Sequence, residues 1–122
     1  MRLLGILQWL GLLAGAALWG AAHVVGYGIS EARCSPAGGT WGIDFDLWEA
    51  LATGIAGTLV VGGAAAAAAV VVATSGSSYE SPPPEGRLRF FAIAALVANA
   101  IFLAMIVLYA IGSIANLPCR QA

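Results

Sequence analysis

The sequence contains no lysine and few charges of either sign: only 9% of its 122 residues are charged. Soluble domains average about 25% charged residues. The five basic and six acidic residues leave a net charge of −1, so the chain has no basic surface of the kind that binds nucleic acid. These shortages exclude an ordinary soluble domain and predict no nucleic-acid partner.

Residues that carry chemistry are also scarce. The chain has one histidine, two cysteines and two methionines, which do not form a recognisable set of metal ligands. Its sequence has no Cys-x-x-Cys pair, phosphate-binding glycine loop, zinc-protease helix or nucleophile elbow. We therefore expect no catalytic residues, no resident metal and no enzyme activity.

Apolar residues, in contrast, make up 61% of the sequence, and the mean hydropathy is +0.91. They form three long runs, at about 3–29, 47–74 and 90–114. A helix of about 20 apolar residues spans the ~30 Å hydrocarbon layer of a bilayer, and each run exceeds that length. The sequence therefore predicts an all-α integral membrane protein, in which residues 1–122 form one antiparallel three-helix bundle surrounded by lipid.

The polar segments fix the topology. The first loop covers about 30–46, the second loop covers 75–89 and is rich in proline, and the tail covers 115–122. Three crossings place the first loop and the tail on the same side of the membrane. Because Cys34 lies in that loop and Cys119 in that tail, a disulfide between them is predicted. Free thiols, and metal or thiol-exchange chemistry, are the alternatives.

The arginines and the cysteines indicate the same orientation. With the amino terminus in the cytoplasm, three arginines face inwards and two face outwards, which agrees with the positive-inside rule. The inner arginines are Arg2, Arg87 and Arg89, and the outer ones are Arg33 and Arg120. Both cysteines then face the periplasm or the cell exterior, where disulfides persist. The carboxyl terminus is expected on that outer side.

A second interpretation of the amino terminus is a cleaved signal peptide over residues 1–22, which ends in a Gly-Ala-Ala sequence. The apolar run continues past this point to residue 29, which favours a retained membrane helix. Cleavage would leave two helices, and the two cysteines would still share one side of the membrane.

Small residues predict the packing surfaces. The first run contains Gly11 and Gly15 in a Gly-x-x-x-Gly spacing, and the second contains Gly54, Gly57 and Gly62. Small residues let helix backbones approach closely, and packing is the main force between helices in lipid. We expect these faces to pack on a partner membrane protein or on a second copy of the chain.

Asn99 lies near the middle of the third run, where an unpaired amide would cost several kcal/mol. It must therefore face another helix. Thr58, at a similar depth in the second run, is the expected hydrogen-bonding partner. A transport site at this depth is the alternative.

The second helix has a start signal. Asp46 precedes the apolar run and Glu49 follows three residues later, as in a capping box. Two acids in a first turn also suit the helix dipole. A carboxylate pair for a metal or for acid–base chemistry is the alternative, and it would need a third partner.

His23 is the one residue in the runs with a plausible cofactor role. Together with Trp19 and Tyr27, at a spacing of four, it forms a stripe on one helix face. An ionisable group inside a membrane segment is a functional candidate, and histidine can ligate haem or copper or pass a proton. A haem with two histidine ligands would need a second subunit. The other interpretation is a neutral histidine hydrogen-bonded across a helix interface.

Several of these residues follow one another in a known arrangement. A tryptophan, a histidine, a tyrosine, a loop cysteine and a terminal Pro-Cys occur in that order, at Trp19, His23, Tyr27, Cys34 and Pro118-Cys119. The last run also begins with basic residues and phenylalanine. This pattern resembles that of small bacterial membrane proteins encoded beside haem–copper cytochrome c oxidase subunits and an oxidase assembly protein. The chain departs from it at Ala16, where a proline is common.

The resemblance implies a bacterial inner (cytoplasmic) membrane and a role in aerobic respiration. The first functional hypothesis is therefore a non-catalytic accessory or assembly protein that binds cytochrome oxidase subunits. One alternative is a haem-binding electron-transfer protein, dimeric through His23. Another is a small channel or transporter subunit, although the low polarity of every run argues against a water-filled path.

Overall fold

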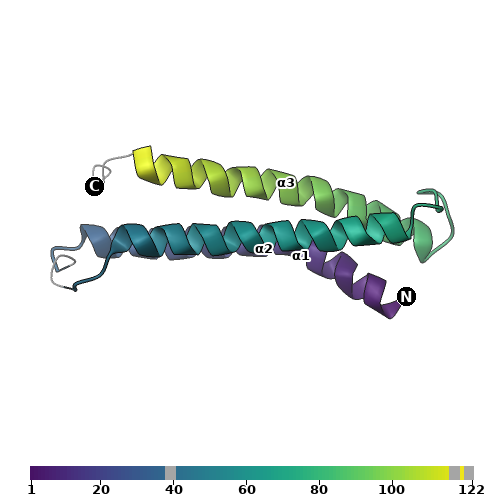
Figure 1. The fold of residues 1–122 in the computed structure, drawn as a ribbon, viewed down its shortest axis with the longest axis horizontal. Coiled ribbons are helices and arrows are strands. Elements are labelled where there is room, and N and C mark those ends of the chain that lie inside the picture. The colour runs from purple at the N-terminus through teal and green to yellow at the C-terminus, as the bar shows by residue number, and fades with distance from the viewer. Residues whose placement is uncertain (38–40, 116–118, 120–122) are drawn as a thin grey trace.

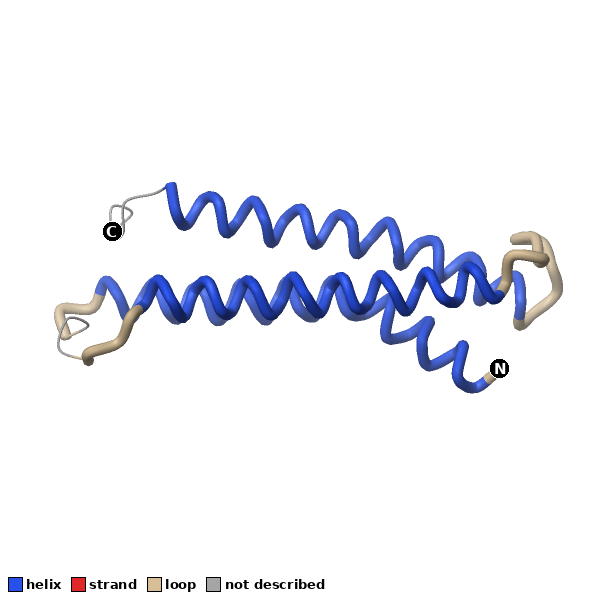
Figure 2. The backbone as a smooth tube through the Cα atoms, viewed as in Figure 1, coloured by secondary structure: helices blue, strands red, loops and turns tan. Residues whose placement is uncertain are grey.

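Three long helices pack against one another. The computed structural model describes residues 1–37, 41–115 and 119, and in these it contains α1 (Arg2–Cys34), α2 (Phe45–Ala73) and α3 (Glu85–Ala115). The three helices form an antiparallel bundle (Figure 1), with both connecting loops at its ends (Figure 2). All three are long and apolar enough to cross a membrane. The chain is thus a small integral membrane protein of the predicted class.

All three helices extend beyond the predicted limits, two of them by five residues at one end. α1 continues to Cys34, five residues past position 29, and α3 begins at Glu85, five residues before position 90. The prediction was short because bilayer thickness limits the apolar length of a helix and not its total length. At 1.5 Å per residue, the 33 residues of α1 reach about 50 Å. α1 is therefore longer than the hydrocarbon layer is thick.

The start of α2 differs from the predicted capping box. The N-cap is Asp44, whose Oδ1 accepts a hydrogen bond from the backbone N–H of Leu47 at 3.1 Å. Asp46 lies inside the first turn, so the assignment of Asp46 and Glu49 as the cap was wrong by two residues. The error arose because the helix begins at Phe45, before the continuous apolar run.

The other end of α2 is closed by a side chain from α3. Arg89 Nη1 donates to the carbonyl oxygens of Thr74 at 2.8 Å and Val71 at 3.4 Å. The last carbonyls of a helix lack partners within the helix, and a cation is favourable there. The guanidinium also lies 5.8 Å from the ring centroid of Tyr79. Arg89 therefore fixes the proline-rich loop end of the bundle.

Replacing Arg89 should loosen that end. We expect Arg89→Gln to lower the free energy of unfolding by about 1–2 kcal/mol, because charge-assisted hydrogen bonds to orphan carbonyls are lost. Thermal unfolding in detergent micelles, followed by circular dichroism, measures the change. Arg87→Gln is the matched control, since Arg87 is exposed. Equal effects of the two substitutions would contradict the capping role.

The core between the helices consists mostly of alanine and valine. Its most buried residues include Val60, Ala67 and Val70 on α2 and Ala92 and Ala95 on α3, each with 0% exposure. Such small and β-branched side chains let the backbones approach closely, which is how helices associate in lipid.

Gly11 and Gly15 face into this core. A Cβ on Gly11 would lie 2.9 Å from the Ala67 Cβ, and a Cβ on Gly63 would lie 2.5 Å from the Ala14 Cβ. The expectation that the Gly11/Gly15 face packs on a partner or a second copy was therefore wrong. That face brings α1 onto α2 and α3 within one chain.

Asn99 is the polar centre of the bundle, with 1% exposure. Its Nδ2 donates to the carbonyl oxygens of Gly11 at 2.7 Å and Ala95 at 2.8 Å. Thr58 is exposed and donates to the Gly54 carbonyl on its own helix at 2.8 Å. The predicted Asn99–Thr58 pair was wrong, because equal depth in the membrane does not place two residues on facing sides.

The other polar atom of this amide has an unusual environment. Asn99 Oδ1 is buried and accepts no hydrogen bond from the described residues. It lies 2.8 Å from the position of a Cβ on Gly15 and 3.5 Å from that on Gly63. The absence of a side chain at Gly15 therefore leaves room for this oxygen beside α1. Any larger residue at position 15 would displace the amide.

Candidate functional site at the disulfide end

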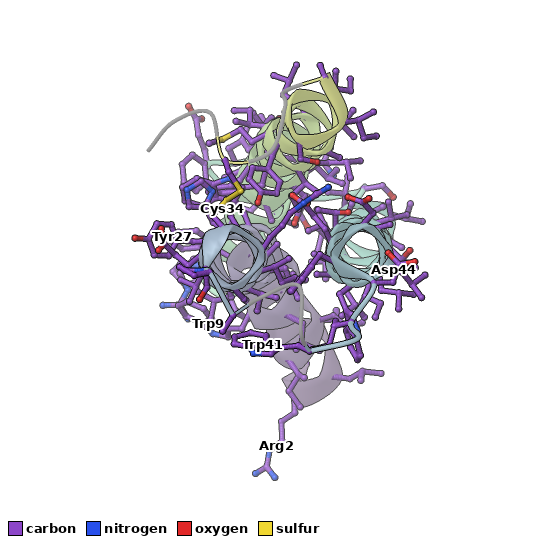
Figure 3. All side chains as sticks on the ribbon, turned by 90° about the vertical axis from the view of Figure 1, so that its left-hand side faces the viewer. Arg2, Trp9, Tyr27, Cys34, Trp41 and Asp44 are labelled. Carbon is purple, nitrogen blue, oxygen red and sulfur yellow. A yellow bond between two sulfur atoms is a disulfide. The ribbon has the colours of Figure 1, made fainter. Side chains whose placement is uncertain are left out.

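A disulfide joins α1 to the segment that follows α3. It links Cys34 to Cys119, with 5.3 Å between their Cα atoms, and is visible beside the Cys34 label in Figure 3. This bond was predicted from the topology. Its end of the bundle, where α1 and α3 end and α2 begins, is called here the disulfide end. The rest of the predicted tail beyond Ala115, including Pro118 and Arg120, lies outside the described residues.

An ion pair connects α1 and α2 across the first loop. Arg33 Nη1 lies 2.6 Å from Asp46 Oδ1, with 30% of the arginine side chain and 76% of the aspartate side chain exposed. Exposed pairs of this kind contribute at most about 1 kcal/mol to stability. The Arg33–Asp46 pair matters for its position, because it forms a charged rim at the disulfide end.

Below this rim lies an aromatic cluster formed by Trp19, His23, Phe102 and Tyr109. The His23 ring centroid lies 5.5 Å from that of Trp19 and 5.6 Å from that of Tyr109. The ring centroids of Trp19 and Phe102 lie 5.8 Å apart. Tyr27, the third member of the predicted stripe, points away from the bundle (Figure 3) and is 67% exposed.

Tyr109 links all three helices. Its hydroxyl lies directly against Gly26 of α1, where a Cβ would collide with it. The Glu49 carboxylate of α2 lies close to the same hydroxyl. Sequence reasoning missed Tyr109 and Gly26, because only the three-dimensional register of α1 and α3 brings them together. Glu49, predicted as a capping residue, lies beside the Tyr109 hydroxyl instead.

His23 itself is exposed and its ring is in contact with two aromatic rings. Among the residues that the structure describes, no three His, Cys, Asp or Glu side chains converge on a possible metal position. Both cysteines are oxidised to the disulfide and offer no thiolate. Since His23 is the one histidine of the chain, a haem held by two histidines would need a second copy or another protein.

A groove of about 810 Å³ opens between α2 and α3 at the disulfide end. Figure 1 shows α3 moving away from α2 toward its carboxyl end. Arg33, Asp46 and Glu49 line the mouth of this α2–α3 groove. Most of the remaining lining is apolar or small, and includes Gly54 and Gly57.

The glycines predicted for packing thus divide into two groups. Gly11 and Gly15 pack inside the bundle, whereas Gly54 and Gly62 are exposed, with no atom of the described residues within 4 Å of a Cβ placed on either. Gly57 is intermediate, with Leu103 Cδ1 at 3.7 Å from its Cβ position. Of the glycines predicted for packing, those that remain free for a partner are therefore on α2.

Comparison with known proteins assigns no family, because no family model, curated protein or solved structure matches the chain.

Proposed function

We propose that the chain is a non-catalytic accessory or assembly protein of a haem–copper cytochrome oxidase in the bacterial inner membrane, with its amino terminus in the cytoplasm. Support comes from the order of Trp19, His23, Tyr27, Cys34 and Cys119, which resembles that of small proteins encoded beside oxidase genes. The cysteines also form a disulfide, and this bond is compatible with an external disulfide end.

The observation that carries this proposal is the outward face of α2. Gly62, Ala65 and Ala69 share one face of the helix at spacings of three and four and are all exposed. Alanine and glycine gain little from contact with lipid, but they let the backbone of another membrane helix approach closely. The face formed by these three residues therefore suits a transmembrane helix of a larger complex.

Among the described residues, the core of a single copy is closely packed. Val60, Ala67 and Val70 are fully buried at successive levels of α2, and the Asn99 amide bonds to Gly11 between them. The packed core thus favours a binding role over a transport role.

Affinity purification of a tagged chain from respiring membranes in mild detergent tests the proposal. We expect oxidase subunits to co-purify, and Gly62→Leu to lower their recovery at least about fivefold, since ~1 kcal/mol of packing is lost. Gly20→Leu is the matched control, because no atom of the described residues lies within 4 Å of a Cβ on Gly20 either. Absence of oxidase subunits from the unaltered preparation would refute the proposal.

A further inference from the structure

The α2–α3 groove has the depth of one bilayer leaflet. Its α2 wall runs from Glu49 near the rim to Val61, which is about 18 Å at 1.5 Å per residue. Half of the hydrocarbon layer is about 15 Å. Beyond that point Val70 of α2 shares a buried cluster with Leu88 and Ala92 of α3, so the two helices close together there. With its mouth at the membrane surface, a groove of this length would reach about the midplane.

This depth distinguishes between two kinds of occupant. A transmembrane helix of a partner spans the full ~30 Å of hydrocarbon, about twice the length of the groove. A phospholipid occupies one leaflet, with its headgroup at the surface and its acyl chain ending near the midplane. The groove matches the second occupant in length.

The lining of the groove suits an acyl chain. Gly54 and Gly57 have no side chains, so the α2 wall of the groove is formed there by the helix backbone. Leu103, Val107 and Ile114 form the α3 wall. Such a channel buries CH₂ groups along both sides, and burial of apolar surface is favourable wherever a chain would otherwise leave a poorly packed gap. Side-chain bulk at Gly54 would fill the channel just below its mouth.

Charged side chains surround the mouth of the groove. It carries one guanidinium, from Arg33, and two carboxylates, from Asp46 and Glu49. Because Arg33 and Asp46 already pair at 2.6 Å, the uncompensated charge is negative. A primary ammonium can donate three hydrogen bonds to carboxylates, and a neighbouring phosphate would lie near the arginine. A quaternary ammonium cannot donate any.

We propose that the α2–α3 groove is a binding site for one phospholipid with a primary-amine headgroup, of the phosphatidylethanolamine type. Its ammonium binds Glu49 and Asp46, its phosphate faces Arg33, and one acyl chain lies over Gly54 and Gly57. The site is independent of the proposed oxidase partner, since every residue in it belongs to this chain.

Native mass spectrometry of the purified chain in detergent tests the site. Phosphatidylethanolamine is added in one sample and phosphatidylcholine with the same acyl chains in another. We expect phosphatidylethanolamine to be retained at least about tenfold more, because only its ammonium donates hydrogen bonds. Gly54→Leu should lower retention about tenfold by filling the channel, whereas Gly20→Leu, on α1 and outside the groove lining, should leave it unchanged.

A second variant tests the headgroup separately from the channel. Glu49→Gln should abolish the preference for phosphatidylethanolamine over phosphatidylcholine while leaving the acyl-chain channel open. Each variant is checked for an intact disulfide and unchanged helix content. Equal retention of both lipids by the unaltered chain would overturn the proposal. So would a Gly54→Leu chain that retains lipid normally but loses its protein partner, because the groove would then be a helix-docking surface.

Discussion

Gly63→Ala is expected to lower the free energy of unfolding of the bundle by about 1–3 kcal/mol, the usual cost of overpacking a core. A Cβ at this position would lie 2.5 Å from the Ala14 Cβ, so α1 and α2 must separate to admit it. That separation also weakens the hydrogen bond from Asn99 to Gly11, which is 2.7 Å long. Unfolding in mixed micelles, with helix content and tryptophan fluorescence as signals, measures the change.

The preceding residue supplies the control. Gly62 belongs to the same helix and the same residue type, but no atom of the described chain lies within 4 Å of its Cβ position. Gly62→Ala should therefore raise the free energy of unfolding by up to about 1 kcal/mol through helix propensity alone. If both substitutions stabilise the protein, the close contact between α1 and α2 at Gly63 does not exist.

Reduction of the Cys34–Cys119 disulfide is the second change that we expect to lower the free energy of unfolding strongly. The bond closes a loop across a sequence separation of 85, for which chain entropy predicts about 4–5 kcal/mol in an unconfined chain. Membrane helices remain inserted after they separate, which restricts the unfolded state, so we expect a loss of about 2–4 kcal/mol. Unfolding in micelles with and without reductant measures it.

A double substitution, Cys34→Ser with Cys119→Ser, separates the bond from other effects of the reductant. This variant should match the reduced protein and should not respond to reductant itself. If the oxidised protein is no more stable than the double variant, α1 and α3 are held at this end by helix packing alone.

The features predicted correctly from the sequence are those that the thickness and the two sides of a bilayer determine. The number of helices follows from apolar run length, because a helix must cross ~30 Å of hydrocarbon. The pairing of Cys34 with Cys119 follows from three crossings, which bring both to one side. Neither inference requires knowledge of which helix face is buried.

The buried faces of the helices could not be predicted, because α2 carries small and apolar residues on all sides. Gly54, Gly62 and Gly63 look alike in the sequence, yet only Gly63 is buried. The partner of Asn99 was missed for the same reason. A backbone carbonyl, exposed by the absence of a side chain at Gly11, accepts its hydrogen bond, and no polar side chain marks that position in advance.

The candidate site was only partly visible. His23 and Trp19 were found by their spacing, but Tyr109 lies more than eighty residues away and joins them only in the folded chain. Glu49 was assigned to a cap because its local spacing fitted one. The helix in fact begins at Phe45 behind the Asp44 cap, which leaves the Glu49 side chain to face Tyr109 and the groove.

The positions of the two cysteines have a consequence for biosynthesis. Gly11 and Gly63 bring α1 and α2 together, and both helices leave the ribosome before α3, so this hairpin can form first. Cys119 lies beyond the last residue of α3 and cannot reach Cys34 until that helix has crossed the membrane. An oxidised molecule is therefore one whose insertion has been completed, and the fraction oxidised in newly made chains would report the progress of assembly in the cell.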